Sequence, residues 1–178
     1  MKYLIASDLH GSLYYTQKLF EQIENEKPNK IVLLGDLYYH GPRNPLPKDY
    51  NPKEVSNLLN SIKNKLICIK GNCDAEVDQM ISEFKIMKYK KIKVKDSQIL
   101  FTHGHLYNID NPKKDIDIMF YGHFHQNSIT KKDNKIFVNV GSTSLPKNNS
   151  ANSYAILTEN EIVLKDLISA EIISHIKF

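Results

Sequence analysis

The chain has 178 residues, of which 41% are hydrophobic and 25% are charged. This length and balance exclude an intrinsically disordered chain and predict a single domain spanning residues 1–178. The net charge of +4 is modest, and we expect no nucleic-acid partner. No apolar run approaches the roughly 18 residues of a membrane span, and no signal peptide is recognisable, so we expect a cytoplasmic protein with no membrane partner. The two cysteines, Cys68 and Cys73, do not predict a disulfide framework.

Short apolar segments recur along the chain, and each one ends at a polar motif. They are rich in aliphatic and β-branched residues, which is typical of β-strands. The predicted strands are Lys2–Ser7, Lys30–Leu34, Lys65–Lys70, Gln98–Thr102, Ile116–Tyr121 and Lys135–Val140. Because ligand groups in α/β sheets gather beyond the carboxyl ends of the strands, we expect the polar motifs to converge on one site.

Helical patterns separate the early strands. Ser12 is a suitable cap for a first helix, Pro52 opens a second, and Ala75–Phe84 predicts a shorter third. The chain is strand-rich after residue 85, where the alternating lysines of Lys91–Lys95 indicate a strand at a sheet edge. The first half therefore predicts a βαβαβ order and the second half a β-meander, in two sheets packed face to face under helices.

Residues 35–52 form a long loop that contains four of the seven prolines. Because proline fixes the backbone, we expect an ordered flap beside the polar site. Arg43, the only arginine of the chain, lies on this flap. Arginine binds phosphate through two parallel hydrogen bonds, although an arginine on a loop is also often simply solvated.

Histidine, aspartate and asparagine side chains at these motifs predict a metal site. The candidate ligands are Asp8, His10, Asp36, Asn72, His103, His123 and His125. One ion uses four to six ligands, so two ions that share a carboxylate fit this set better. Extended backbone would point Asp8 and His10 the same way, and likewise His123 and His125. Imidazole and carboxylate ligands favour manganese, iron, cobalt or zinc over a structural site built from thiolates.

Two such ions form a clamp for displacement at phosphorus and supply a nucleophile at neutral pH. Two divalent ions, the carboxylates of Asp8 and Asp36 and a bridging hydroxide leave a net charge of about +1, which complements a singly charged phosphodiester. The residues therefore predict hydrolysis of a phosphodiester by attack of the bridging hydroxide.

The ordered series D-x-H, G-D, G-N-x-D, H-G-H and G-H-x-H resembles that of the calcineurin-like metallophosphoesterases, and the resemblance covers essentially the whole chain. It implies a four-layer α/β/β/α sandwich of two mixed sheets, and manganese most often, with zinc, iron, cobalt or nickel as other candidates. It also implies that one ion is held by Asp8, His10, Asp36 and His125. The second would be held by Asp36 as the bridging ligand, Asn72, His103 and His123.

The chain departs from the family pattern at Cys73, where most active members carry histidine. A thiol is a poor hydrogen-bond donor, so activated aryl diesters that need no proton on departure should be hydrolysed best. The metal-generated nucleophile makes a covalent role for Cys73 unnecessary. We expect Asp74 to fix the Asn72 loop and His105 to contact phosphate or orient a ligand.

Two function classes remain from the sequence. The leading one is a two-metal-dependent phosphodiesterase for a small or activated diester. The alternative is a scaffold or binding module of the same fold, like the retromer subunit, although such scaffolds are expected to lose metal ligands and all seven positions are filled here. Exposed isoleucines near the C-terminus, Ile168, Ile172, Ile173 and Ile176, would allow a homo-oligomer.

Overall fold

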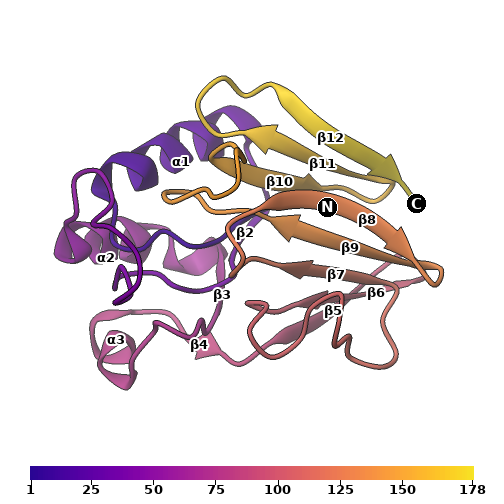
Figure 1. Cartoon of the computed structure of the whole chain (residues 1–178), viewed down its shortest axis with the longest axis horizontal. Coiled ribbons are helices and arrows are strands. Elements are labelled where there is room, and N and C mark those ends of the chain that lie inside the picture. Colours follow the sequence, from indigo (N-terminus) through magenta and orange to yellow (C-terminus); the bar gives the residue numbers. More distant parts are fainter.

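The computed structural model describes residues 1–178, which form two mixed β-sheets with the helices gathered on one side, at the left of Figure 1. The seven-stranded sheet has the spatial order β12 (Ile172–Lys177), β11 (Glu161–Asp166), β10 (Ser153–Leu157), β1 (Tyr3–Ala6), β2 (Lys30–Leu33), β3 (Leu66–Ile69) and β4 (Ile86–Met87). Strands β1 to β4 are parallel to one another, and β10 to β12 are antiparallel to their neighbours. The predicted βαβαβ order is confirmed.

The five-stranded sheet has the order β5 (Lys90–Val94), β6 (Ser97–Phe101), β7 (Ile118–Tyr121), β9 (Lys135–Val140) and β8 (Asn127–Lys132). The β5–β6 and β8–β9 pairs are antiparallel hairpins, but β6, β7 and β9 are parallel. The predicted meander is therefore wrong. The long segment between β6 and β7 carries the chain back to the end of the sheet at which β6 began, so β7 runs parallel to β6. The lysine-flanked strand β5 lies at the sheet edge, as predicted.

The helices begin at the predicted signals. Ser12 caps α1 (Leu13–Glu26) by accepting a hydrogen bond from the Tyr15 amide, at 3.3 Å. Helix α2 (Pro52–Ser61) begins at Pro52, and a short 3₁₀ helix follows at Lys63–Lys65. Helix α3 (Glu76–Ile81) is shorter than predicted. No helix combines the length and the apolar character that crossing a bilayer requires.

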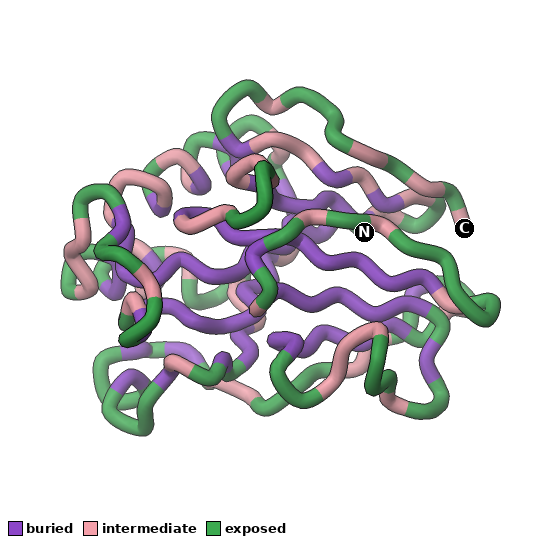
Figure 2. The backbone as a smooth tube through the Cα atoms, viewed as in Figure 1, coloured by how far each residue is buried: buried purple, intermediate pink, exposed green.

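Three apolar cores hold these layers together, and Figure 2 shows the buried strands at the centre of the molecule. One core lies between the two sheets, and it includes Ile5 and Val32 from one sheet and Phe101 and Phe120 from the other. A second packs α1 and α2 against the seven-stranded sheet. The third covers the outer face of the five-stranded sheet with the irregular segment 104–116. The predicted fold of two mixed sheets is confirmed. The outer layer on the five-stranded sheet is this irregular segment, where the predicted α/β/β/α sandwich has a helical layer.

The carboxyl ends of the parallel strands of both sheets meet at one edge. The Thr143 amide, beyond β9, donates to the Ser7 carbonyl, beyond β1, at 2.9 Å. Within the seven-stranded sheet the Asp8 amide donates to the Gly35 carbonyl at 3.0 Å. Within the other sheet the Gly122 amide donates to the His103 carbonyl at 2.7 Å. The loops that carry the polar motifs are therefore fixed to one another by backbone hydrogen bonds.

Candidate metal centre

The candidate ligands come from loops that follow five different strands. Asp8 and His10 follow β1, Asp36 follows β2, Asn72 follows β3, His103 follows β6, and His123 and His125 follow β7. The structure brings these loops together at the edge where the two sheets meet. The sequence rule that ligands gather beyond strand ends describes this arrangement well.

The backbone that presents these side chains is left-handed at five positions. The φ angles are 58° at Asp8, 48° at His10, 54° at Asp36, 68° at His123 and 58° at His125. The expectation of extended backbone with alternating side chains is therefore wrong. Left-handed residues other than glycine are uncommon and gather at functional sites, where surrounding contacts hold them.

Two glycines allow the loops to approach one another closely. A Cβ atom on Gly71 would lie 2.0 Å from Oδ1 of Asp36. A Cβ atom on Gly122 would lie 2.1 Å from Oγ of Ser7 and 2.5 Å from Oδ2 of Asp8. Any side chain at either position would push the aspartates out of place, so glycine is required there.

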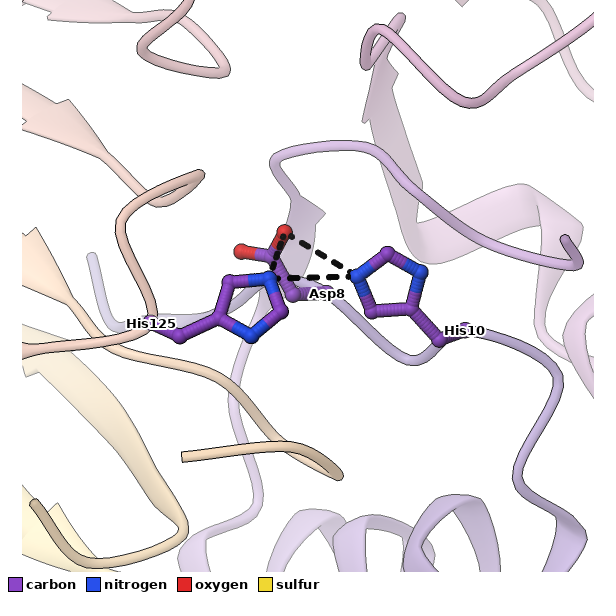
Figure 3. Close-up of side chains that lie close together, drawn as sticks. All are labelled: Asp8, His10 and His125. Carbon is purple, nitrogen blue, oxygen red and sulfur yellow. Dashed lines mark hydrogen bonds and ion pairs between the residues drawn. The ribbon is translucent and has the colours of Figure 1, made fainter. Parts of the chain in front are cut away.

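Asp8, His10 and His125 form a buried cluster in which the side chains point toward one another (Figure 3). Nε2 of His10 lies 3.2 Å from Nε2 of His125, and Oδ1 of Asp8 lies 3.3 Å from Nε2 of His125. The other ring nitrogens are occupied: Nδ1 of His10 donates to the Tyr39 carbonyl at 2.8 Å, and Nδ1 of His125 to the Leu145 carbonyl at 2.6 Å. In neutral rings, both Nε2 lone pairs then face the Asp8 carboxylate.

A second cluster repeats this arrangement around Asp36, His103 and Asn72. Nδ1 of His103 donates to the Leu34 carbonyl at 2.8 Å, so its Nε2 faces Oδ1 of Asn72 at 3.0 Å and Oδ2 of Asp36 at 3.4 Å. The same Oδ2 lies 3.7 Å from Nε2 of His10, so Asp36 stands between the two clusters. The half-buried His123 lies at their edge, with its ring 5.1 Å from that of His103.

The carboxylates of Asp8 and Asp36 stabilise positive charge in this centre. Burial opposes a charged His103, yet Asp36 and Asp8 raise the pKa of His103 to about 9. Burial likewise opposes charge on His10, whose pKa is nevertheless raised by Asp8 and Asp36. Burial alone would raise the pKa of Asp8, but His10 and His125 hold it well below its usual range.

A divalent cation fits the donor chemistry of the centre. Oδ1 of Asp8 is buried without a hydrogen-bond partner, and imidazole nitrogens with carboxylate and amide oxygens converge on it and on Asp36. These are the ligand types of manganese, iron, cobalt and zinc. Backbone carbonyls fix the tautomer of three of the imidazoles, which is the usual outer support of a metal-binding histidine.

Asp74 and Cys73 both form hydrogen bonds with Asp36. The buried Asp74 carboxylate accepts hydrogen bonds from the amides of Asp36 (2.8 Å), Leu37 (2.7 Å) and Gly71 (2.6 Å), and so ties the loop after β3 to the loop after β2. The Cys73 amide donates to Oδ1 of Asp36 at 2.8 Å. Burial and the carboxylate of Asp36 raise the pKa of the Cys73 thiol to about 12, so the thiol is neutral at pH 7.

The centre opens into a cleft of about 640 Å³ beneath the proline-rich flap. Arg43, Tyr39 and Cys73 line it, together with Lys147 from the turn after β9. His105 is exposed, and its ring lies 5.3 Å from that of His103, outside the residues that line the cleft. Partial desolvation of the ring and the neighbouring His103 lower the pKa of His105. Sequence reasoning missed Lys147, because no local motif surrounds it.

Residues 1–161 match the calcineurin-like phosphoesterase superfamily domain, and the chain belongs to this family. It is similar to phosphodiesterase YfcE of Escherichia coli strain K12, with 35% identity over 179 residues that cover 99% of this chain and 97% of the relative. A solved YfcE structure matches with a TM-score of 0.95, 35% identity and coverage of 99% and 98% of the two chains.

Two further matches are more distant. The probable metallophosphoesterase YsnB of Bacillus subtilis is 32% identical over 171 residues, which cover 90% of this chain and 86% of the relative. Vacuolar protein sorting 29 of Cryptosporidium parvum shares the fold, with a TM-score of 0.67, 18% identity and coverage of 99% and 97%. The predicted family, fold and enzyme class are confirmed.

Proposed function

We propose that the chain is a two-metal-dependent phosphodiesterase that hydrolyses a small or activated phosphodiester. The observation that carries this proposal is the convergence of imidazole nitrogens with carboxylate and amide oxygens at the base of one cleft. The similarity to phosphodiesterase YfcE along nearly the whole chain supports the choice of a diester.

In this proposal Asp8, His10, Asp36 and His125 hold one divalent ion, and Asp36, Asn72, His103 and His123 hold the other. We propose manganese, which the family resemblance implies most often. When bound, two divalent ions polarise the phosphoryl oxygens and supply a hydroxide nucleophile from water at neutral pH. The chain itself holds the imidazoles in one tautomer through three backbone carbonyls and holds the Asp36 loop through Asp74.

Cys73 limits which diesters are good substrates. Its neutral thiol lies among the carboxylates of Asp36, Asp74 and Asp8 and is a weak hydrogen-bond donor, so a poor leaving group receives little assistance. Changing Cys73→His should raise kcat on an unactivated alkyl diester by about 10²-fold, which is the lower end for general acid assistance. An unchanged rate on the alkyl diester, with normal turnover of an aryl diester, would contradict this role for the cysteine.

The direct test is hydrolysis of bis(4-nitrophenyl) phosphate by the protein after chelation and after addition of Mn²⁺. We expect turnover only with the added ion, followed as release of 4-nitrophenolate. The same titration with Zn²⁺, Co²⁺ and Ni²⁺ ranks the ions. Turnover by the chelated protein, or no turnover with any of these ions, would contradict the proposed function.

A binding module of the same fold is the second candidate, because the fold is shared with vacuolar protein sorting 29. The two candidates differ in whether the protein hydrolyses a diester when metal is present. A scaffold would hydrolyse no diester, with or without bound metal, whereas the phosphodiesterase requires metal for turnover. The assay above therefore separates them.

A further inference from the structure

We propose that the cleft binds a second anionic group of the substrate, a phosphate monoester, between Arg43 on the flap and Lys147 on the turn after β9. This inference rests on the proposed phosphodiesterase function and names a chemical class of substrate for it. Both cations line the cleft into which the metal centre opens. They are exposed, whereas Asp36 and His125 beneath them are buried.

The flap holds Arg43 on an ordered backbone. Oγ of Ser12 donates to the Lys48 carbonyl at 2.6 Å, and the Asn51 amide donates to the Gly11 carbonyl at 2.8 Å. Closer to the arginine, Nδ2 of Asn44 donates to the His40 carbonyl at 2.8 Å. These bonds fix the flap at its base and around Arg43, which lines the cleft.

Lys147 comes from the loop between β9 and β10, which is hydrogen-bonded to a candidate metal ligand. The Lys147 amide donates to the His125 carbonyl at 2.9 Å, and the Ser150 amide donates to the Lys147 carbonyl at 3.0 Å. In addition, Nδ1 of His125 donates to the Leu145 carbonyl at 2.6 Å. The lysine backbone therefore keeps a fixed position relative to the metal centre.

Neither cation is neutralised by the protein. The carboxylates that line the cleft are Asp36 and Asp74, and both are buried and engaged by backbone amides. The guanidinium of Arg43 and the ammonium of Lys147 form no salt bridge. Apart from histidine, every other basic side chain of the protein is lysine, yet its single arginine, the residue best suited to phosphate, lies in this cleft.

The charge of the substrate follows from this balance. The charge expected for the loaded metal centre, about +1, is already matched by the single negative charge of a diester. Two further cations at a shallower level suit a group that carries about two negative charges, as a phosphate monoester does near pH 7. A substrate with both a diester and a terminal phosphate therefore matches the cleft better than a diester alone.

Two matched chromogenic diesters test this proposal. Thymidine 5′-(4-nitrophenyl phosphate) is compared with the same compound carrying a 3′-phosphate, since both release 4-nitrophenolate. We expect kcat/KM to be about tenfold higher for the 3′-phosphorylated compound, because two exposed charge pairs add about threefold each. Arg43→Gln and Lys147→Gln should each lower this preference about threefold. The double variant should abolish it, and Arg43→Lys should retain most of it.

A control variant and a binding measurement complete the test. Lys53→Gln removes an exposed lysine on α2, outside the cleft, and should leave the preference unchanged. Calorimetry should show about tenfold tighter binding of thymidine 3′,5′-bisphosphate than of thymidine 5′-monophosphate to the metal-loaded protein, with the difference lost in the double variant.

The outcomes separate this inference from the proposed function. Bisphosphate preference in binding, without turnover of any diester, would support the second anion site and contradict the phosphodiesterase. Turnover without a preference would overturn the second anion site alone. An equal fall for both diesters in the double variant would also overturn it, because the cations would then act on the scissile phosphate.

Discussion

Glu26, at the end of α1, and Asp36, in the loop after β2, are both acidic residues, but their surroundings differ. Glu26 accepts hydrogen bonds from Nζ of Lys2 and Nζ of Lys165, both at 2.5 Å, and from the Tyr154 hydroxyl at 3.2 Å. Asp36 instead faces the ring nitrogens of His10 and His103 and, across the centre, the carboxylate of Asp8.

The difference is one of charge balance. Burial alone would raise the pKa of Glu26, but the two lysines lower it, so the Glu26 cluster is neutralised by permanent cations of the chain. The candidate metal centre has no lysine or arginine among its proposed ligands and relies on histidines that carry charge only when protonated. Carboxylates whose charge is neutralised by lysines of the same chain stabilise the fold. Carboxylates without such permanent cations are suited to bind a metal cation.

The largest effect is expected at Asp36. Changing Asp36→Asn removes the carboxylate shared by the two clusters, and we expect metal-dependent kcat/KM on bis(4-nitrophenyl) phosphate to fall about 10³-fold, or about 4 kcal/mol of transition-state stabilisation. Asp133→Asn is the matched control, because Asp133 has a φ of 50° in the β8–β9 turn and loses the same charge. Similar values of kcat/KM for the two variants would contradict a role of Asp36 in the metal centre.

Asp74 tests how the protein holds the centre together. Asp74→Ala leaves three buried amides without an acceptor and should lower the free energy of unfolding by about 3 kcal/mol, measured in urea. Asp74→Asn keeps one acceptor oxygen and should cost about half as much. Equal stability of the two variants would show that these hydrogen bonds do not hold the loops.

Added metal should stabilise the centre without involving Glu26. With Mn²⁺ at one hundred times its dissociation constant, the free energy of unfolding should rise by about 2.7 kcal/mol for one site. The rise should be reduced in Asp36→Asn and retained in Glu26→Gln. A thermal shift with Mn²⁺ that is the same in all three proteins would indicate binding elsewhere.

Glu26 itself should contribute a small, pH-dependent stability. Glu26→Gln should cost about 1 kcal/mol at pH 7, discounted because both lysines are partly exposed. Since the folded-state pKa of Glu26 is lowered, its contribution is present above its unfolded pKa of about 4.3 and is lost as the pH falls through the folded value. Urea unfolding at pH 7 and pH 3 measures this. A loss of stability in Glu26→Gln that is the same at pH 3 as at pH 7 would exclude the ion pairs as its cause. The control variant Glu21→Gln, which breaks an exposed pair, should change the free energy of unfolding little.

Local sequence patterns predicted most of the fold. Strand positions, the Ser12 cap and the edge position of β5 follow from side-chain periodicity and chemistry within a few residues. The parallel pairing of β6 with β7 does not, because segment 104–116 has no helical period that would reveal a crossover. The meander prediction relied on turn signals, which identify hairpins and say nothing about longer connections.

The candidate site was predictable in composition but not in geometry. His and Asp after strand ends indicated the centre, whereas the left-handed backbone at Asp8 and His125 depends on contacts with distant loops. Lys147 could not be predicted, since its place in the cleft depends on a hydrogen bond to the His125 carbonyl. The hydrogen bond from His10 to the Tyr39 carbonyl on the flap, which orients the His10 ring, could not be predicted either.

An anomalous-difference map from crystals grown with Mn²⁺ tests the two-metal centre most directly. We predict two peaks, one beside Asp8, His10 and His125 and one beside Asn72, His103 and His123, with the carboxylate of Asp36 in contact with both. No peak at these side chains, or a single peak that Asp36 does not contact, would contradict a two-metal centre in this protein.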